Sequence, residues 1–575
     1  MINLKINGQD VSVPEGYTVL DAAREVGINI PTLCYLKDLN QIGACRMCLV
    51  EIKGARALQA ACVYPVAEGI EVFTNSEKVR KARKTTLELI LSNHERKCLT
   101  CIRNRNCELQ KLADELGVED IPFEGENIKY DIDDASESLV RDNNKCILCR
   151  RCIAACDNQE VSVISCVNRG FSTEVAAAFG KDMSEVGCIY CGQCIVACPV
   201  GALYEKTHIP KVQAAIDNPE KHVVVQTAPA VRAALGEEFG LPIGTPVTGK
   251  MAAALRRLGF DKVFDTDTAA DLTIMEEGTE FIQRFTKNEK LPLITSCSPG
   301  WVKFCEHYYP EFTENLSTAK SPMEMFAAVI KSYYAEKSGI DKKDIYSVAI
   351  MPCTSKKFEA SRPELSADGI PDVDASLTTR ELARMIKQAG INFAELPDEE
   401  FDQPFGEATG AGVIFGTTGG VMEAAIRTVY ELLEGKPLDN LNVEAVRGLE
   451  DVKEATLTIA GKDVKVAVVH GTKKAKELLE RVKAGEHYDF IEIMACPGGC
   501  IHGGGQPIVD SATKAKVDVK ALRAKALYSE DEASTLRKSH ENPYIKKLYE
   551  EYFGEPCSHK AHELLHTTYT KRSRF

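Results

Sequence analysis

The sequence predicts a multidomain protein of mixed α+β and α/β class, with a small β-rich module at its amino terminus and a two-lobed α/β domain at its carboxyl terminus. Three observations support this prediction. The chain has 575 residues, more than one hydrophobic core usually serves. Of its 22 cysteines, 16 lie before residue 200. Beyond about residue 210, apolar strand-like runs alternate with helical patterns. We expect domains at 1–77, 78–125, 126–208 and 209–575.

Composition narrows the function. The chain is 44% apolar and carries a net charge of −14, which argues against general nucleic-acid binding. It has no apolar run of bilayer length and no secretory signal, so we expect a cytoplasmic protein without membrane contact. Many thiols in a long chain without a signal favour metal or redox sites over disulfides.

Residues 1–77 open with a hairpin pattern. Met1–Ile6 and Gln9–Val13 alternate around the turn Asn7-Gly8, and Thr18 is placed to cap a helix over Val19–Val26. The module's cysteines have the spacing C-x10-C-x2-C-x13-C. One short pair with distant outer ligands suits a two-iron cluster in a β-grasp, plant-type ferredoxin-like module, with zinc as the alternative. The predicted [2Fe-2S] ligands are Cys34, Cys45, Cys48 and Cys62.

Residues 78–125 predict a helical module with a different cysteine pattern, H-x3-C-x2-C-x5-C. Its histidine lies one helical turn before the first cysteine, so both can face one ion. We expect a [4Fe-4S] cluster held by His94, Cys98, Cys101 and Cys107. The alternative is that His94 is an ordinary surface residue.

Residues 126–208 begin with an acidic segment, 126–140, that we expect to be an exposed connector. Two copies of C-x2-C-x2-C-x3-C follow. In the bacterial two-cluster ferredoxin pattern, the fourth cysteine of each copy binds the other cluster. One predicted [4Fe-4S] site therefore comprises Cys146, Cys149, Cys152 and Cys198, and the other Cys188, Cys191, Cys194 and Cys156. We expect the four accessory clusters to conduct electrons in series.

Residues 209–575 contain four apolar runs that each end in a sharp turn: His222–Gln226, Leu291–Thr295, Tyr346–Met351 and Phe490–Met494. Three of the four turns carry a cysteine. Parallel sheets place ligand sites at the carboxyl ends of their strands. We therefore expect a single catalytic domain with a crevice lined by thiols.

A further motif near the carboxyl terminus is set aside. His562 to His566 match H-E-x-x-H, the helix of zinc proteases. Little chain follows to supply a third ligand, so we expect an exposed helix face. Cys557 has no partner in spacing and is expected to be a free thiol.

Three crevice segments, TSCSPGW at 295–301, MPCTSKKFE at 351–359 and EIMACPGGCIHGGGQP at 492–507, resemble the signature segments of the [FeFe]-hydrogenases. The upstream cluster sites are similar to the long, clostridial form of that family. QTAPAVRAALGE and TGKMAAALRRLGFD also resemble catalytic subunits of NAD(P)-linked multimeric hydrogenases. The resemblance covers essentially the whole chain.

The resemblance implies reversible hydrogen oxidation and proton reduction at an H-cluster, a [4Fe-4S] cubane bridged to a di-iron unit with CO, CN⁻ and azadithiolate. Implied cubane ligands are Cys353, Cys496 and Cys500, with Cys500 bridging. Lys356 would hydrogen-bond a cyanide. The implied di-iron pocket is lined by Ala228, Pro229, Met351, Met494, Phe415 and Gly416. Implied electron partners are ferredoxin, NAD(P)H-linked flavoprotein and iron–sulfur subunits, or both.

The resemblance also implies a proton path through Cys297, Glu277, Ser317, Glu280 and Arg284. The sequence departs from the family at two positions. Met323 stands where some members have glutamine, and Ser298 stands where the family places a cubane ligand. We expect Ser298 to bind through oxygen while Cys297 relays protons. The alternatives are that Cys297 is the ligand, or that three thiolates hold the cubane.

Two other functions fit part of the sequence. A non-catalytic relative would be an electron relay or an H₂ sensor. The first 200 residues also suit an iron–sulfur subunit of a respiratory NADH dehydrogenase, but the three crevice segments argue against that. The chain has no Rossmann fingerprint, so any link to a nicotinamide would require a partner subunit.

Overall fold

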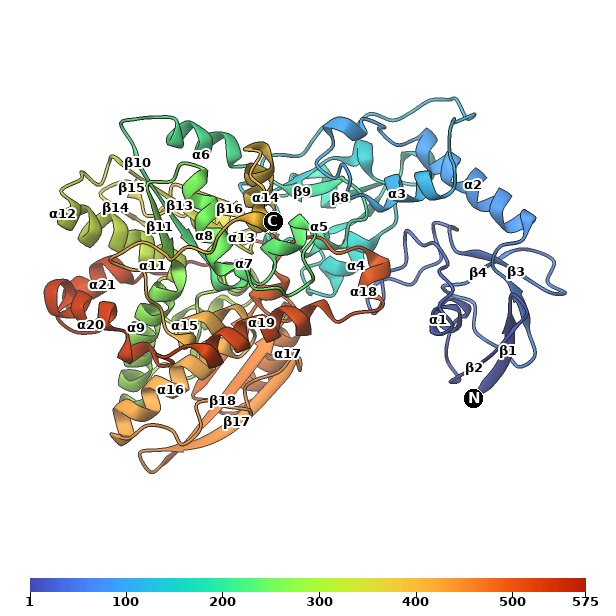
Figure 1. Ribbon diagram of the computed structural model, residues 1–575. Helices are drawn as coiled ribbons and strands as arrows, with labels where there is room; N and C mark the ends of the chain where they lie inside the picture. The colour runs from blue at the N-terminus through green and yellow to red at the C-terminus, as the bar shows by residue number, and fades with distance from the viewer. Residues whose placement is uncertain (575) are drawn as a thin grey trace.

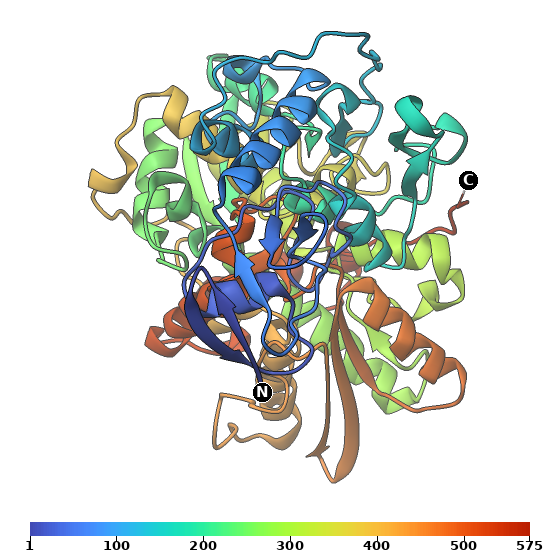
Figure 2. The ribbon, with the colours of Figure 1, turned by 90° about the vertical axis from the view of Figure 1, so that its right-hand side faces the viewer.

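A computed structural model describes residues 1–574 of the chain. The amino-terminal module stands at one end of the molecule, beside the cysteine-rich region, and the large domain forms the other end (Figure 1). Seen from that first end, the amino-terminal module lies in front of the rest of the molecule (Figure 2). Among the described residues, no helix has both the length and the apolar character needed to cross a membrane.

The amino-terminal module is a five-stranded sheet with strand order β2-β1-β5-β3-β4. Its strands are β1 (Ile2–Ile6), β2 (Gln9–Val13), β3 (Leu49–Ile52), β4 (Gln59–Ala60) and β5 (Glu71–Phe73). β1 and β2 pair antiparallel around Asn7 and Gly8, whose φ values of 52° and 85° suit the predicted tight turn. Thr18 caps α1 (Val19–Glu25) in a capping box with Asp21. The predicted hairpin and helix are confirmed.

The cysteine-rich region is built from short elements. Its helices are α2 (Glu77–Ser92), α3 (Glu108–Glu115), α4 (Arg151–Asp157) and α5 (Gln193–Ala197), and its strands are β6 (Leu139–Arg141), β7 (Ile164–Val167), β8 (Glu174–Ala177) and β9 (Leu203–Glu205). The prediction that 126–140 is exposed is wrong at its carboxyl end. Ser136, Ser138, Leu139 and Val140 are buried because β6 pairs antiparallel with β9.

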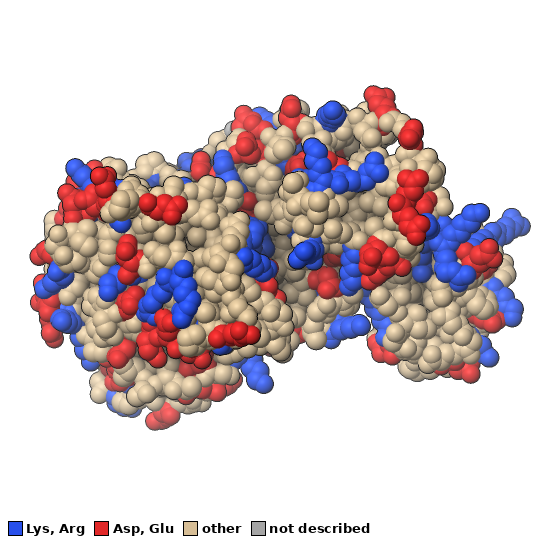
Figure 3. Space-filling model, turned by 45° about the horizontal axis from the view of Figure 1, so that its top comes forward, with Lys and Arg blue, Asp and Glu red and all other residues tan. Residues whose placement is uncertain are grey.

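Charge is unevenly spread over the surface of this end of the molecule. The first turns of α2 expose Lys78, Arg80 and Lys81. In the space-filling view, lysine and arginine side chains gather at the end of the molecule that carries the amino-terminal module, whereas acidic side chains are scattered over the face shown (Figure 3). A chain with a net charge of −14 thus has a local basic surface beside its outer cysteine groups.

The large domain holds two separate four-stranded sheets, one for each lobe. The first, β11-β10-β13-β16, is wholly parallel, and the second, β12-β19-β18-β17, is parallel except for the β17–β18 pair. Their strands are β10 (His222–Thr227), β11 (Lys262–Asp265), β12 (Leu293–Ile294), β13 (Ile345–Met351), β16 (Ala375–Thr378), β17 (Val452–Ile459), β18 (Lys462–His470) and β19 (Phe490–Met494); β14 (Ser366–Ala367) and β15 (Ile370–Pro371) form a separate hairpin. Each of the four predicted apolar runs contains a strand.

Helices surround both sheets (Figure 1). They are α6 (Ile209–Ile216), α7 (Pro229–Arg232), α8 (Thr248–Arg257), α9 (Thr266–Lys287), α10 (Pro299–Tyr308), α11 (Pro322–Val329), α12 (Ala335–Ser338), α13 (Ser355–Glu359), α14 (Thr379–Gln388), α15 (Gly410–Val413), α16 (Gly420–Glu434), α17 (Thr472–Lys483), α18 (Ser511–Lys514), α19 (Val519–Ala533), α20 (Pro543–Leu548) and α21 (His559–Leu565). The long, buried α9 packs on α11 of one lobe and α16 of the other. It therefore ties the two lobes together.

Candidate active site

Four cysteines of the large domain lie just beyond strand ends. Cys353 follows β13 in the first lobe, whereas Cys297, Cys496 and Cys500 follow β12 and β19 in the second. Burial raises the pKa of the Cys496 thiol, and the neighbouring thiols of Cys353 and Cys500 raise it further. The two sheets therefore bring their carboxyl ends to one thiol-lined site, as the sequence predicted.

Glycines allow the two lobes to approach each other so closely. A Cβ atom on Gly503 would lie 2.2 Å from the carbonyl oxygen of Pro352, and one on Gly504 would lie 2.3 Å from that of Cys191. Real Cβ contacts are never this short, so the backbone at these positions has room only for glycine. The glycine run after Cys500 thus seats the second lobe against both the first lobe and the cysteine-rich region.

The adjacent residues Cys297 and Ser298 face different neighbours. The Cys297 thiol lies near Glu277 and Cys500; its burial and the Glu277 carboxyl raise its pKa. Ser298 begins α10, and its hydroxyl accepts a hydrogen bond from the backbone N–H of Ala495 at 3.3 Å, next to Cys496. One side chain therefore faces the acidic helix α9, and the other faces the cysteine segment after β19.

The ammonium group of Lys356 lies beside these thiols and is fixed by three hydrogen bonds. Its ammonium group donates to the Glu359 carboxylate at 2.6 Å, to the Ser321 hydroxyl at 2.8 Å and to the Cys297 carbonyl at 3.2 Å. Burial tends to lower the pKa of Lys356, but Glu359 outweighs this and raises it above its ordinary value. A fixed cation thus lies in the wall of the site.

The predicted pocket residues are all buried and come from both lobes. Met494 and Phe415 share an apolar cluster against which Cys297 packs. Ala228 and Met351 belong to the cluster of the other lobe, together with Met323. Pro229 and Gly416 are also buried, and a Cβ on Gly416 would lie 3.2 Å from the Cβ of Ala230, so the short helix that carries Phe415 and Gly416 packs against the turn after β10.

The five predicted proton-path residues form a continuous group. Glu277 and Glu280 lie on α9, and the Ser317 hydroxyl donates to Glu280 at 2.8 Å. One carboxyl oxygen of Glu277 is buried without a hydrogen-bond partner among the described residues, and burial raises the pKa of Glu277 to about 8. At the outer end, Arg284 donates to Glu280 at 2.7 Å. The chain thus runs from the Cys297 thiol toward the partly exposed Arg284.

Two cavities in the cysteine-rich region match the predicted exchange of fourth cysteines. One is lined by Cys146, Cys149, Cys152 and Cys198. The other is lined by Cys156, Cys188, Cys191 and Cys194. Each cavity is bounded by mostly apolar residues, and its four soft thiolate donors suit an iron–sulfur cubane.

The four thiols of the amino-terminal module assemble, and two of the three thiols of the His94 module (residues 78–125) lie near each other. In the amino-terminal module, the Cys34 thiol contacts those of Cys45 and Cys62, and Cys48 contacts Cys62. Cys101 and Cys107 lie near each other after α2. In the same module, Nδ1 of His94 is buried without a hydrogen-bond partner among the described residues, and burial lowers the pKa of His94. A neutral histidine with a free ring nitrogen is the form that binds metal.

The amino-terminal module and the His94 module both contact the cavity lined by Cys146, Cys149, Cys152 and Cys198, called the Cys149 cavity below. The Asn40 amide of the amino-terminal module donates to the Cys149 carbonyl at 3.0 Å. From the His94 module, the Arg103 guanidinium donates to the Cys198 carbonyl at 3.2 Å, and the Cys101 thiol lies where a Cβ on Gly201 would approach within 2.7 Å. Two modules therefore adjoin the Cys149 cavity, an arrangement that favours two branches over the single series that we expected.

The cavity lined by Cys156, Cys188, Cys191 and Cys194, called the Cys191 cavity below, borders the thiols of the large domain. The Cys496 thiol lies 3.9 Å from the carbonyl oxygen of Cys191. Thr354 and Ser355, which follow Cys353, donate to the carbonyls of Tyr190 and Ile189 at 2.6 and 2.9 Å. The cysteine-rich region thus leads directly into the crevice.

Comparison with known families accounts for most of the chain. Residues 221–504 match the C-terminal domain of the iron-only hydrogenase large subunit, and 517–572 match the iron hydrogenase small subunit. Residues 1–77 match a 2Fe-2S cluster binding domain, 83–122 the NADH-ubiquinone oxidoreductase-G iron-sulfur binding region, and 186–204 a 4Fe-4S binding domain.

Among curated proteins, the chain is 51% identical to the NADP-reducing hydrogenase subunit HndD of Solidesulfovibrio fructosivorans, over 100% of both chains. The chain belongs to the iron-only hydrogenase family. It is also 46% identical to iron hydrogenase 1 of Clostridium pasteurianum, over 99% of this chain and 100% of the relative. A variant of apo [FeFe]-hydrogenase HydA1 from Chlamydomonas reinhardtii matches 64% of this chain and 100% of its own, with 46% identity and a TM-score of 0.57.

The family membership confirms the predicted fold class and activity: this hydrogenase is an oxidoreductase that acts on H₂ and carries iron–sulfur domains. Sequence reasoning missed three residues that support its site. Thr318 donates to Glu280 through both its backbone N–H and its hydroxyl, and Ser321 and Glu359 hold Lys356. Glu359, three residues after Lys356 on α13, was detectable from helical spacing.

Proposed function

We propose that this hydrogenase interconverts H₂ with protons and electrons at an H-cluster held between its two lobes. When bound, that group supplies the iron centre at which H₂ is formed or cleaved. Cys353, Cys496 and Cys500 would hold the cubane as soft thiolate donors, with Cys500 bridging to the di-iron unit. Lys356 would hydrogen-bond a cyanide. The pocket of the di-iron unit would be lined by Ala228, Pro229, Met351, Met494, Phe415 and Gly416.

One observation carries this proposal: the buried thiols of the large domain lie between a second thiol-lined cavity, which suits an electron route, and the carboxyl of Glu277, which suits a proton route. On one side, the Cys496 thiol is 3.9 Å from the carbonyl of Cys191, a residue of the nearest cubane cavity. On the other side, the Cys297 thiol lies beside Glu277, the inner residue of the carboxylate chain. A purely structural iron–sulfur site has no need of a buried proton-carrying chain.

The residues present fit the proposed group. The site offers three thiols, a fixed Lys356 cation for an anionic ligand and an apolar wall from both lobes. Ser298 would supply the fourth cubane donor, because its hydroxyl points toward the Ala495–Cys496 segment. Cys297 would then remain free to exchange protons with Glu277.

Glu277 is suited to pass protons because burial raises its pKa to about 8, close to neutral pH. A proton from Cys297 would reach Glu277 and then, through the Ser317 hydroxyl, Glu280. Arg284 holds Glu280 at the outer end of the chain and keeps its carboxylate oriented. The proposed path thus uses all five predicted residues.

The proposed accessory cofactors are one [2Fe-2S] cluster and three [4Fe-4S] clusters, with the ligands predicted from spacing. The relative named as an NADP-reducing hydrogenase subunit supports NAD(P)-linked flavoprotein and iron–sulfur partner subunits, ferredoxin, or both as electron donors or acceptors. We propose a cytoplasmic location and domain boundaries at 1–77, 78–125, 126–208 and 209–575.

Anaerobic maturation with the di-iron cofactor tests the function. We expect about 20 iron atoms per chain, infrared bands from bound CO and cyanide, and H₂ evolution with a reduced donor. About 14 iron atoms, no such bands and no H₂ evolution after maturation would instead establish an electron relay. The Cys500→Ala variant, which removes the proposed bridging thiolate, serves as the control that lacks the di-iron unit.

A further inference from the structure

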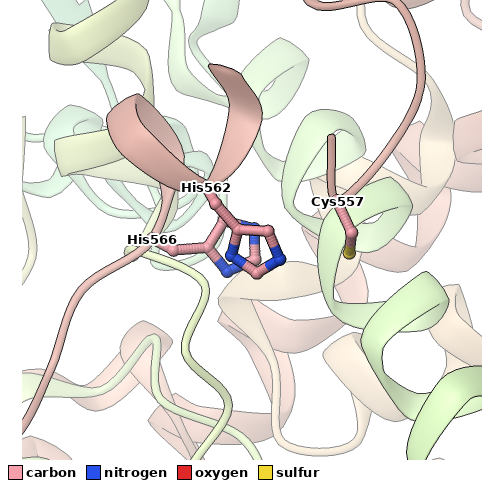
Figure 4. A group of neighbouring side chains, drawn as sticks. All are labelled: Cys557, His562 and His566. Atoms are coloured by element: carbon pink, nitrogen blue, oxygen red, sulfur yellow. The ribbon is translucent and has the colours of Figure 1, made fainter. Parts of the chain in front are cut away.

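A cluster of potential metal ligands lies outside the proposed H-cluster site. Cys557, His562 and His566 each offer one ligand atom, and these atoms all lie within 4.8 Å of one another. They come from α21 and from the two turns that flank it, and Figure 4 shows the two imidazole rings beside the Cys557 sulfur. The H-E-x-x-H pattern thus gains the third ligand that the sequence did not reveal.

Helix geometry and one buried carboxylate bring the three side chains together. His562 and His566 are four residues apart, and their ring centroids are 4.1 Å apart. Glu276 of α9 accepts from Nε2 of His566 at 2.9 Å and from the backbone N–H of Cys557 at 2.8 Å. The Tyr549 hydroxyl fixes the other oxygen of Glu276. The carboxylate therefore orients two of the three ligands.

We propose that Cys557, His562 and His566 bind a Zn²⁺ ion, with solvent in the fourth position. One thiolate and two imidazoles form a donor set that zinc favours, and three protein ligands with an open position are typical of accessible zinc sites. In a tetrahedral site, ligand atoms are separated by about 3.3–3.6 Å, so modest rotamer adjustment from the present arrangement is enough. His562 is exposed and gives the ion access from solvent.

The charges around the cluster also favour a cation. The buried Glu276 carboxyl contacts both His566 and the backbone of Cys557, and Glu280 lies one helical turn farther along α9. These two acidic side chains attract a positive ion.

The cluster adjoins the outer end of the proposed proton path. Nδ1 of His566 lies 2.8 Å from the Thr318 hydroxyl oxygen, and this hydroxyl donates to Glu280 at 3.1 Å. His566 already uses one ring nitrogen for Glu276 and the other for Thr318, so zinc must replace one of these contacts. Resting on the proposed function, we infer that bound zinc disturbs the hydrogen bonds at Glu280 and slows turnover reversibly.

Zinc titration of the matured hydrogenase tests the site. Wild type should retain one more Zn²⁺ per chain than His562→Ala after equilibrium dialysis against ZnCl₂, and Cys557→Ser should bind at least tenfold more weakly. His559→Ala removes an exposed histidine of the same helix that is not in the cluster, so it should match wild type. X-ray absorption at the zinc edge should show one sulfur at about 2.3 Å and two nitrogens at about 2.0–2.1 Å.

Equal zinc retention by wild type and His562→Ala, with unchanged iron content, would overturn the site. So would a zinc-edge spectrum without sulfur. The kinetic consequence is tested separately: micromolar ZnCl₂ should lower the turnover of wild type severalfold and leave His562→Ala unaffected. If zinc binds without changing turnover, the metal site is supported and its proposed effect on the proton path is wrong.

Discussion

Residues 1–208 and the large domain assemble their predicted metal sites in opposite ways. In the first region, every predicted site contains at least one pair of ligands three residues apart in the chain, and two of the four sites contain three ligands with that spacing. In the second, the proposed cubane ligands Cys353 and Cys496 follow the ends of two strands, β13 and β19, that belong to different sheets. Local spacing defines the former sites, whereas the pairing of two lobes defines the latter.

This difference predicts how each region responds to change. An accessory site depends on its own short segment, so losing one ligand should affect one cluster and one step of electron transfer. The catalytic site depends on side chains from both lobes acting on the same few atoms. Substitutions there should therefore have the larger effects, and the surface of the molecule should tolerate the most.

The largest expected effect is that of Cys297→Ala. If Cys297 carries the proton and Ser298 holds the cubane, this variant should lose about a thousandfold in turnover, because proton transfer typically contributes a factor of 10² to 10⁴. Its infrared bands and iron content should stay those of wild type. Ser298→Cys should keep activity and shift the potential of the cubane, since thiolate is a softer donor than a serine oxygen.

The outcome that would contradict this assignment is specific. Loss of the cubane's EPR signal and of its four iron atoms in Cys297→Ala would make Cys297 the ligand. Cys305→Ala is a matched control, because Cys305 is a buried cysteine of α10 that belongs to no predicted site.

The sequence predicted the accessory sites better than their arrangement. Fixed spacing predicted which eight cysteines line the two cavities of the two-cluster motif, whereas the contact of the amino-terminal module with the Cys149 cavity depends on Asn40, 109 residues away in the chain. The position of Cys353 and Cys496 just after predicted strands was enough to predict that the two residues lie in one crevice. The role of Thr318 could not be predicted, because it depends on how the turn after α10 packs on α9. Likewise, Cys557 and His566 are held near each other by Glu276, which is 281 residues from Cys557 in the chain.

The next largest effect should come from Glu277→Gln, with about a hundredfold loss of turnover because an amide cannot relay the proton. Burial raises the pKa of Glu277 to about 8, so the folded protein keeps this proton while the unfolded chain loses it above about pH 4.3. Its favourable contribution to folding is therefore complete at low pH and is lost as the pH rises toward 8.

Anaerobic melting curves of wild type and variant measure this directly. The apparent Tm of wild type relative to Glu277→Gln should fall between pH 4.5 and 8 and stay level above that. Asp271→Asn is the control, because Asp271 lies on the same helix with its pKa raised to about 6 but contacts Thr409 and Asn542 instead of the path. The Asp271→Asn variant should keep the turnover of wild type. A pH-independent difference for Glu277→Gln would show that its carboxyl is already ionised.

A smaller effect should follow loss of the [2Fe-2S] cluster in Cys48→Ala. Because the amino-terminal module and the His94 module each contact the Cys149 cavity, we expect electrons still to enter through the His94 module. We expect turnover with a protein donor to fall severalfold rather than to vanish, and turnover with reduced methyl viologen to stay near that of wild type. Complete loss with every protein donor, at full occupancy of the other clusters, would restore the series arrangement.

The smallest effect should be that of His94→Ala. The contact of the amino-terminal module with the Cys149 cavity remains intact in this variant. Loss of one ligand often shifts the reduction potential of a cluster without removing the cluster, so we expect turnover with a protein donor to fall by about two- to fivefold. The infrared bands of the di-iron unit should not move, since the catalytic thiols adjoin the Cys191 cavity and not this module. His94→Cys supplies a thiolate in place of the imidazole. This variant should keep the cluster and lower its reduction potential, because thiolate donates more charge to iron.

If His94→Ala and His94→Cys both match wild type in rate and in EPR, then the buried, unpartnered nitrogen of His94 has no metal to bind. The second branch would then require a different fourth ligand beside Cys98, Cys101 and Cys107.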